Sequence, residues 1–384
     1  MKLERVIIGI MTGTSVDNID VAAVKIQLND NNEYTFNLLA SNTYSFNNGI
    51  DSEIKKAMLN TANTSDISRL NYAISIMFAD IIKDFISKNN LNCNTINAVA
   101  IHGQTVWHNP SVDNCNIAST LQLANGSVLS ALLNKTVISD FRAADVALGG
   151  QGAPLVPIFD YYFLKSNNNN VIALNIGGMA NITYIPQGGG IDNVIAFDTG
   201  CGNVLLDEYT RKYYNKPFDK NGEIARTGQI NYNLLNELLN LDYFKQSYPK
   251  SCGRELFNLS LVENSIYKLK LTNNILYSDV LRTLTELTAI TITNSIKICC
   301  KSADVIVKGG GIKNNLLMDL IKDKLNRQFN IIDSDNFGIS STYYEAIAFA
   351  FLGFLSLGSI PGNIPSVTGA KKRVVLGTIS RNIS

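Results

Sequence analysis

Short apolar runs of strand length come in two clusters along the chain, and segments with helical periodicity follow each cluster. The strand-like runs are 6–10 and 21–26 in the first cluster, and 171–176, 182–185 and 194–197 in the second. Helical periodicity follows over 67–86 and 278–299. Strands that cluster and then alternate with helices predict mixed α/β sheets rather than a solenoid or an all-helical bundle.

Further runs extend this pattern. The remaining predicted elements are strands at 98–102, 136–139 and 305–307, a helix at 314–329 and a buried core helix at 346–360. Ser278 is expected to cap the helix over 278–299. The first two strands are close enough to form a hairpin whose tip spans 12–20.

Length and charge exclude several classes of protein. A chain of 384 residues is long enough for two or three domains, and 33 Lys and Arg against 32 Asp and Glu leave a net charge of +1. Because nucleic-acid binding needs a basic face, we expect no nucleic-acid partner. The apolar stretch 346–360 is short for a membrane span, and residues 6–11 are short for a signal sequence. We therefore expect no membrane partner. None of the six cysteines forms C-x-x-C, so we expect reduced thiols and a cytoplasmic location.

Several familiar catalytic motifs are missing from the sequence. It contains no G-x-x-x-x-G-K-[ST] phosphate loop, no G-x-G-x-x-G dinucleotide fingerprint after a strand and no G-x-S-x-G nucleophile elbow. With only two histidines, His102 and His108, a histidine-rich metal site is excluded.

The predicted hairpin tip carries hydroxyl groups on Thr12, Thr14 and Ser15 among small residues. Backbone amides and hydroxyls in such a turn bind a phosphate without a lysine. Asp17 and Asp20 could then hold Mg²⁺ through water. The alternative is an ordinary hairpin capped by Asx-type turns.

A Thr-Gly turn with an acidic residue nearby occurs once in each half of the chain, at 12–17 and at 198–203. Two such turns would suit a duplicated α/β domain that grips a phosphate chain between its halves. The alternative is chance, because Thr-Gly pairs are common in turns.

Two carboxylates follow or open apolar segments. Asp198 comes directly after the apolar run 194–197, where burial would raise its pKa and favour a general base. Glu345 opens the apolar helix at 346–360, where the helix dipole favours a negative charge. The alternatives are a helix cap or a ligand of metal-bound water for Asp198, and an N-terminal cap for Glu345.

Gly309, Gly310 and Gly311 follow a strand and are expected to open a helix, an arrangement that admits a flat ring or a phosphate. The alternative is a tight strand–helix connection.

A polar and aromatic segment at 102–108 includes His102, Gln104 and Trp107 and follows a buried strand. A sugar site uses this mixture, because sugar rings stack on aromatic faces and amides bind hydroxyls. Arg142 could clamp a carboxylate with two hydrogen bonds, or pair with Asp140 or Asp145. The alternative for 102–108 is a loop with one packed tryptophan.

Taken in order, these segments resemble the anhydro-N-acetylmuramic acid kinase family. The matching segments are 9–15, 102–108, 140–142, 149–157, 175–178, 197–200, 250–254, 283–289, 309–311, 345–346 and 367–370. The resemblance runs from residue 9 to about residue 377, which is nearly the whole chain.

The resemblance implies an α/β fold with two RNase H-like domains of the actin/hexokinase-type ATPase superfold around a central cleft. On this basis we expect 1–140 plus 366–384 to form the first domain, which carries the phosphate hairpin. We expect 141–365 to form the second, which carries the catalytic aspartate and the glycine turn on the adenosine side.

The resemblance also implies conversion of 1,6-anhydro-N-acetylmuramic acid, ATP and water to N-acetylmuramate 6-phosphate and ADP in cell-wall recycling, with Mg²⁺ and a homodimer. The implied catalytic base is Asp198, and the second active-site carboxylate is Glu345. The nucleotide-binding residues are Gly13, Thr14, Ser15, Val16, Asp17, Asn18, Ile19 and Asp20, with Gly200 and the 309–311 glycines. On the chemistry of their side chains, we assign sugar binding to His102, Gln104, Trp107 and Arg142.

The sequence departs from the family pattern at three positions. Asn18 stands where Gly is usual, and we expect a conformation there that Asn tolerates, such as the left-handed one. Cys201 replaces a usual Pro and Cys252 a common Thr. Two other functions remain open: another sugar or small-acid kinase of the same superfold, and an actin-like or heat-shock-type conformational ATPase.

Overall fold

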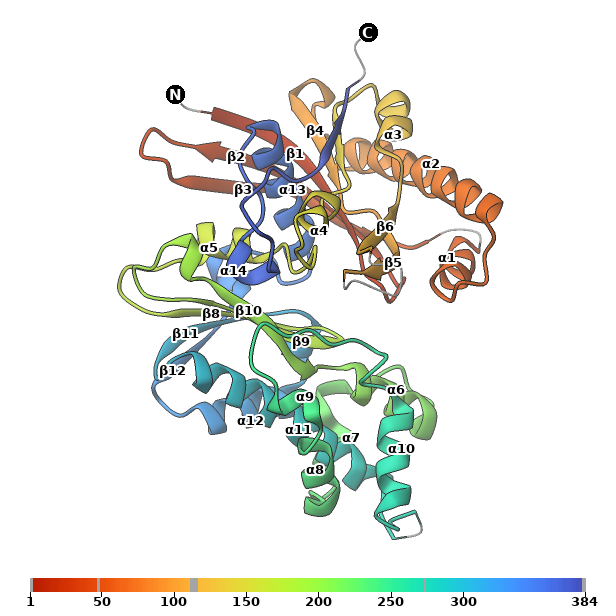
Figure 1. Ribbon diagram of the computed structural model, residues 1–384, viewed down its shortest axis with the longest axis vertical. Helices are drawn as coiled ribbons and strands as arrows, with labels where there is room; N and C mark the ends of the chain where they lie inside the picture. Colours follow the sequence, from red (N-terminus) through yellow and green to blue (C-terminus); the bar gives the residue numbers. More distant parts are fainter. Residues whose placement is uncertain (1–2, 47–48, 111–116, 273, 382–384) are drawn as a thin grey trace. The chain divides into compact units, whose positions relative to one another are not determined.

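A computed structural model describes residues 3–46, 49–110, 117–272 and 274–381 (Figure 1). The chain divides into two compact units, 1–163 with 343–384, and 164–342. These limits differ from the domain boundaries at 140 and 365 expected from the sequence. Residues 141–163 and 343–365 belong to the first unit because Phe159 and Phe351 pack their rings there, 6.0 Å apart, and α13 (Tyr344–Leu357) lies on the first sheet.

Among the described residues, the first unit holds a six-stranded sheet in the order β13-β7-β4-β1-β2-β3. Its strands are β1 (Leu3–Thr12), β2 (Ile19–Leu28), β3 (Tyr34–Tyr44), β4 (Ile96–Ile101), β7 (Val137–Ser139) and β13 (Thr378–Ser380). A separate hairpin pairs β5 (Gln104–Asn109) with β6 (Ser119–Leu123). The other helices are α1 (Ile50–Met58), α2 (Thr64–Lys88), α3 (Gly126–Leu133), α4 (Ala143–Ala147), α5 (Pro157–Leu164) and α14 (Pro365–Thr368).

The second unit holds a five-stranded sheet, within the described residues, in the order β10-β9-β8-β11-β12. Its strands are β8 (Val171–Ile176), β9 (Met179–Ile185), β10 (Ile195–Cys201), β11 (Ala303–Lys308) and β12 (Phe329–Asp333). Its helices are α6 (Val204–Tyr214), α7 (Glu223–Arg226), α8 (Tyr232–Leu239), α9 (Asp242–Lys245), α10 (Leu259–Lys268), α11 (Tyr277–Cys299) and α12 (Asn315–Leu325).

Both sheets are built on one plan. In each, three strands form an antiparallel meander, and two further strands lie parallel to the first: β4 and β7 beside β1, and β11 and β12 beside β8. This repeated order is that of RNase H-like domains. The α/β class and the duplicated domain predicted from the sequence are confirmed.

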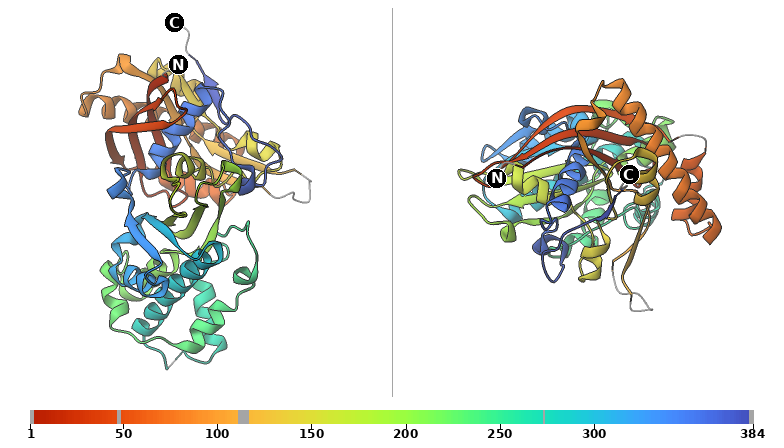
Figure 2. Two further views of the ribbon diagram at one scale, coloured as in Figure 1. Left: turned by 90° about the vertical axis from the view of Figure 1, so that its left-hand side faces the viewer. Right: turned by 90° about the horizontal axis from the view of Figure 1, so that it is seen from above.

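Helix α13 packs unusually closely on the first sheet, where its blue ribbon lies against the red strands (Figures 1 and 2). A Cβ atom on Gly9 of β1 would lie 1.9 Å from the carbonyl oxygen of Ala346, and one on Gly353 would lie 2.7 Å from Cβ of Ala100. Only glycine permits backbone approach this close. Gly9 therefore fixes the first turn of α13, which carries Glu345, beside β1.

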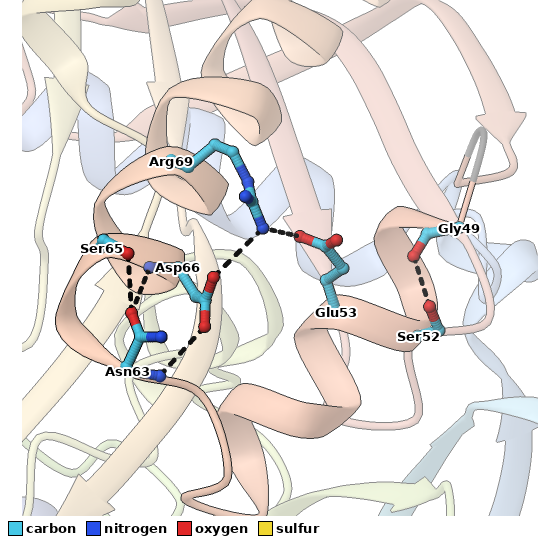
Figure 3. A network of polar contacts seen from close by, with 7 residues as sticks. All are labelled: Gly49, Ser52, Glu53, Asn63, Ser65, Asp66 and Arg69. Atoms are coloured by element: carbon cyan, nitrogen blue, oxygen red, sulfur yellow. Dashed lines mark hydrogen bonds and ion pairs between the residues drawn. The ribbon is translucent and has the colours of Figure 1, made fainter.

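Helix α2 begins with a capping box. Asn63 Oδ1 accepts the N–H of Asp66 at 3.0 Å, and the Asp66 carboxylate accepts the N–H of Asn63 at 3.2 Å. Arg69 then bridges Asp66 and Glu53 of α1 at 3.3 Å each (Figure 3). These exposed pairs add about 1 kcal/mol or less and serve mainly to orient α1 beside α2.

Three local predictions were wrong. Helix α11 begins at Tyr277 after Leu276, so Ser278 is not its cap. The glycines at 309–311 do not open an α-helix, because a 3₁₀ turn, Gly310–Lys313, comes first and Asn314 caps α12. Helix α12 ends at Leu325 instead of 329, where the backbone turns at Asn326 and strand β12 follows.

Candidate functional site

Several of the sequence-predicted site residues lie at the carboxyl ends of parallel strands, whereas Asp198 lies within the antiparallel strand β10 and Glu345 in the first turn of α13. In the first unit, the 13–18 turn follows β1, His102 follows β4 and Arg142 follows β7 by three residues. In the second, the turn 177–178 follows β8 and Gly309 follows β11. Ligands of open α/β sheets bind at this edge, so each unit presents its candidate groups where such a fold places a site.

Four polar side chains form a row across the second sheet. Asp198 of β10 pairs with Asn181 of β9, Asn181 pairs with Asn175 of β8, and Asn175 pairs with Lys308 of β11. Paired residues of adjacent strands share a face. The alternate residues of these strands, such as Ile176, pack with α11 on the other face. The row therefore lies on the face away from α11.

Asp198 is held by the segment 250–252. Its Oδ2 accepts the N–H of Cys252 at 2.9 Å, and its own N–H donates to the carbonyl of Lys250 at 3.0 Å. The Tyr243 hydroxyl donates to the Asp198 carbonyl oxygen at 2.6 Å. These bonds fix the backbone and one carboxylate oxygen of Asp198.

Burial raises the pKa of Asp198 to about 6, and hydrogen bonds from Cys252 only partly offset this effect. The nearby charge of Glu255 raises it further. At neutral pH the carboxylate is mostly ionised yet basic enough to accept a proton, which suits a general base. The raised pKa expected from burial is confirmed, but Asp198 lies inside β10 and not after its end, because the strand continues to Cys201.

Most glycines of the predicted nucleotide side serve packing. A Cβ on Gly200, whose φ is +136°, would lie 2.8 Å from a ring carbon of Phe244. Cβ atoms on Gly309 and Gly311 would meet Asn175 Oδ1 at 2.6 Å and a side-chain carbon of Ile176 at 2.2 Å. A Cβ on Gly310 would meet nothing within 4 Å, so Gly310 presents open backbone.

The topological counterpart of the 13–18 turn is the turn at Gly177 and Gly178, because β1–β2 and β8–β9 occupy the same places in their sheets. The sequence analysis compared 12–17 with 198–203, and this pairing was wrong. It matched the turn after the first strand of one sheet with the end of the third strand, β10, of the other. The backbone at 202–204 closes on the Gly177–Gly178 turn. Gly202 and Val204 donate to the Gly178 carbonyl at 2.9 and 3.0 Å.

The 13–18 turn exposes its polar groups. Thr14, Ser15, Asp17 and Asn18 are exposed. Val16 is buried, donates its N–H to the Gly13 carbonyl at 3.2 Å and has φ +59°. The left-handed residue is thus Val16, and not Asn18 as expected. A β-branched residue in this conformation costs of order 1–3 kcal/mol, which is typical of turns kept for a functional shape. Ile19 begins β2 and is buried.

Asp20 lies at the base of this turn, where its Oδ1 accepts the hydroxyl of Thr43 at 2.7 Å. Burial raises the pKa of Asp20, and the Thr43 bond opposes that rise. In the described part of the chain, no three His, Cys, Asp or Glu side chains gather as a metal site. Mg²⁺ often binds through one or two carboxylates while keeping waters and phosphate oxygens, and Asp20 fits that role.

Arg142 is anchored on the first unit by three hydrogen bonds. Its Nε and Nη2 lie 3.0 and 2.8 Å from His102 Nε2, and its Nη1 donates to the Gly152 carbonyl at 3.1 Å. Asp145 does not pair with it, because its Oδ2 accepts the N–H of Gly152 instead. Burial lowers the pKa of Arg142 to about 10, while the charge of Glu345 raises it, so the guanidinium is charged at neutral pH.

Gln104 lies beside the 13–18 turn, since its Nε2 donates to the Gly13 carbonyl at 3.3 Å. Trp107 stands apart on β5. It is 40% exposed, and its indole N–H donates to Ser119 Oγ at 3.0 Å. Among the described residues, no hydrogen bond joins Trp107 to His102, Gln104 or Arg142. The role of Trp107 in binding a sugar stays a prediction.

Comparisons with known proteins show the family of this chain. The family model described as anhydro-N-acetylmuramic acid kinase matches residues 5–382. The chain belongs to this family. The anhydro-N-acetylmuramic acid kinase of Francisella tularensis subsp. novicida is 39% identical over 97% of this chain and 98% of its own length. The enzyme of that name from Sulfurimonas denitrificans is 40% identical over 97% of this chain and 98% of its own.

Solved structures align more distantly. The activator of 2-hydroxyisocaproyl-CoA dehydratase from Clostridium difficile, with bound ADPNP, covers 92% of this chain and 94% of its own at 14% identity and a TM-score of 0.42. A glucokinase of the ROK family from Streptomyces griseus, in complex with glucose and AMPPNP, covers 90% and 98% at 12% identity and a TM-score of 0.39.

The sequence analysis did not single out Asn181 and Lys308, which lie in the same row of polar side chains as Asp198. Their only sequence signal is a polar residue within or at the end of an apolar strand. It also missed the Tyr243 bond to Asp198. As for the membrane, none of the helices described is long and apolar enough to cross a bilayer.

Proposed function

We propose that this chain uses ATP and water to open the bridge of 1,6-anhydro-N-acetylmuramic acid and phosphorylate its O6, giving N-acetylmuramate 6-phosphate and ADP. The family match over nearly the whole chain supports this reaction. The observation that carries the chemistry is Asp198, a fixed carboxylate whose raised pKa suits it to take a proton from water. The two other candidates, a different sugar kinase and a conformational ATPase, are less favoured by the relatives.

In this reaction Asp198 accepts a proton from water as the water oxygen forms a bond to the anomeric carbon. The bond from that carbon to O6 breaks, and O6 takes the γ-phosphoryl group as ADP leaves. Cys252 holds Oδ2 of Asp198, and this contact orients the carboxylate toward a single proton donor. A positioned base contributes about 10²–10⁴-fold to such a step.

The exposed hydroxyls of Thr14 and Ser15 and the amides of the 13–18 turn bind phosphate oxygens in our proposal. Asp17 and Asp20 would hold Mg²⁺ there through water, and the ion would supply neutralisation of the phosphate charge. Gly310 offers backbone to the nucleotide in the second unit, whereas Gly200, Gly309 and Gly311 shape the turns around it.

Arg142 binds the lactyl carboxylate of the sugar in our proposal. Three of its five N–H groups are used by His102 and Gly152, and among the described residues the other two make no hydrogen bond, so we assign them to the ligand. Gln104 and Trp107 complete the sugar side. Glu345, whose charge acts on Arg142, is the second active-site carboxylate. We further propose that the enzyme works in cell-wall recycling in the cytoplasm as a homodimer.

The decisive experiment is mass spectrometry of the product formed from ATP, the anhydro sugar and ¹⁸O-water. The proposal predicts one ¹⁸O at C1 together with a phosphate on O6. Product without label at C1 would exclude hydrolytic opening. Parallel assays with N-acetylmuramic acid and glucose test the simple kinase, since efficient phosphorylation of either would favour it. ATP-dependent polymerisation with no sugar phosphorylated would favour the conformational ATPase.

A further inference from the structure

We propose that His102 is a positioning residue. It anchors the Arg142 guanidinium through a neutral acceptor, so that the positive charge of Arg142 stays available to an anionic group of the sugar. The inference rests on the proposed function, in which Arg142 binds the lactyl carboxylate. It adds a reason why a histidine, and not a carboxylate, holds that arginine.

The hydrogen bonds assign the protonation state of the ring. Arg142 Nε and Nη2 lie 3.0 and 2.8 Å from His102 Nε2, and a guanidinium can only donate. Nε2 must therefore be the acceptor, and the single ring proton of the neutral imidazole sits on Nδ1. Protonation of Nε2 would break both bonds to Arg142 at once.

The ring is locked in this orientation. His102 is 3% exposed, and its ring packs 4.9 Å from the Phe349 ring of α13. Its backbone N–H donates to the Ile10 carbonyl of β1 at 3.1 Å. Burial and the charge of Arg142 hold the pKa of His102 well below its usual value, although hydrogen bonding by the backbone of Gly103 and Thr12 opposes this.

His102 also carries a cost that a purely structural residue would avoid. Its buried Nδ1 has no partner with full hydrogen-bond geometry among the described residues, although the backbone of Gly103 and Thr12 lies near enough to the ring to raise its pKa. A buried donor left in this state costs about 1–3 kcal/mol, which an apolar side chain of similar shape would not incur. The cost fits a residue whose purpose is to present Nε2 to Arg142.

The choice of a neutral acceptor has a consequence for charge. A carboxylate at position 102 would bind the same two N–H groups but would neutralise the guanidinium. An imidazole fixes the same edge and leaves the charge intact. The charge of Glu345 raises the pKa of Arg142 and so helps to keep the guanidinium protonated. An incoming carboxylate would therefore meet an oriented cation with two unused N–H groups.

The test compares two sugars that differ only in the lactyl group, which carries the carboxylate. These are 1,6-anhydro-N-acetylmuramic acid and 1,6-anhydro-N-acetylglucosamine, which lacks the lactyl group. The measured quantity is the ratio of their kcat/KM values, and in parallel the ratio of their Kd values by calorimetry. A charge-assisted hydrogen-bonded pair implies a ratio of roughly 10–100 for the unaltered enzyme. Arg142→Ala should reduce it to near 1.

The matched pair of variants is His102→Gln and His102→Glu, which have nearly the same shape and differ in charge. His102→Gln keeps a neutral acceptor and should keep most of the ratio. His102→Glu should lower it at least tenfold, with the KM for ATP unchanged. Melting temperatures show whether each variant folds. If the His102→Glu protein is inactive or unstable, the Kd ratio of His102→Leu is measured in its place. That ratio should fall, because Arg142 loses its anchor.

The outcomes separate the two proposals. If His102→Glu or His102→Leu keeps the ratio within about threefold of the unaltered enzyme while Arg142→Ala loses it, the positioning role is wrong. If Arg142→Ala keeps the ratio, Arg142 is not the carboxylate partner and the inference also fails. A third outcome separates them further. If the unaltered enzyme turns over neither sugar, but the Kd ratio changes in the His102 variants as described, the proposed function fails and the inference stands.

Discussion

Replacing Asp198 by Asn tests both the catalytic role of this residue and its effect on stability. The buried carboxylate is the proposed base, and its burial also lowers the free energy of unfolding. Burial raises its pKa from 3.8 to about 6, and a change of one in pKa corresponds to about 1.4 kcal/mol. At pH 7.5 the ionised carboxylate therefore destabilises the fold by at most about 3 kcal/mol. Asn removes the charge and keeps an oxygen for the Cys252 N–H.

The direction with pH follows from linkage. The pKa of the folded-state carboxyl is higher than that of the unfolded state, so between about pH 4 and pH 6 the folded protein binds more protons. The penalty is absent below both values, grows as pH rises and is complete above about pH 6. The gain in stability of Asp198→Asn should be at most about 3 kcal/mol at pH 7.5, and at pH 5 about half of its value at pH 7.5.

Activity should change in the opposite direction. The variant should lose about 10²–10⁴-fold in kcat while binding of ATP persists. In the unaltered enzyme, kcat/KM for the sugar should fall below about pH 6 and be about tenfold below its plateau at pH 5, because protonated Asp198 cannot accept a proton.

Urea unfolding at both pH values, followed by fluorescence, and a coupled ADP assay measure these effects. Asp192→Asn is the matched control, since Asp192 is an exposed carboxylate of the same unit and should change neither quantity. An Asp198→Asn protein that is inactive but no more stable at pH 7.5 would refute the desolvation argument. One that is more stable yet retains near-normal turnover would refute the assignment of the base.

Three further predictions address the surroundings of the site and the fold. Cys252→Thr replaces a weak thiol donor beside Asp198 by a hydroxyl, which should lower the pKa of Asp198 and move the acid limb of the kcat/KM profile to lower pH; an unmoved limb would contradict the side-chain contact. Glu286 is 5% exposed and accepts bonds from an arginine and a lysine, which lower its pKa although burial opposes them. In urea, Glu286→Gln should cost about 2 kcal/mol at neutral pH and less as pH falls below about 4.5; a cost that does not change with pH would count against the ion pairs. Gly9→Ala should destabilise by several kcal/mol or prevent folding, because its Cβ would lie 1.9 Å from the Ala346 carbonyl oxygen; a melting temperature within a few degrees of the unaltered protein would mean that α13 can move away.

The elements that the sequence predicted well are those whose pattern is local. The helix expected over 67–86 lies within α2, and its start is fixed by a capping box that spans only four residues. Strand β1 contains the predicted run 6–10. In these segments the hydrophobic period and the capping residues act within a few positions, so propensity and tertiary structure agree.

The missed features depend on contacts between distant segments. Leu276 begins α11 without a side-chain cap, and tertiary packing of its buried face compensates. Helix α13 belongs to the first unit because Gly9, more than 300 residues earlier, leaves room for its backbone. Neither the start of α11 nor the placement of α13 can be predicted from a short stretch of sequence.

The same division applies to the site. The sequence places Asp198 after an apolar strand and so predicts a raised pKa, but how far the pKa rises depends on an amide 54 residues away that holds its carboxylate. His102 and Arg142 are 40 residues apart and were assigned to one sugar site by residue type alone. Only the structure makes His102 the acceptor, which changes its role from a contact of the ligand to the support of Arg142. Residue type thus predicts which chemistry is present, while the partners that set protonation and orientation come from the fold.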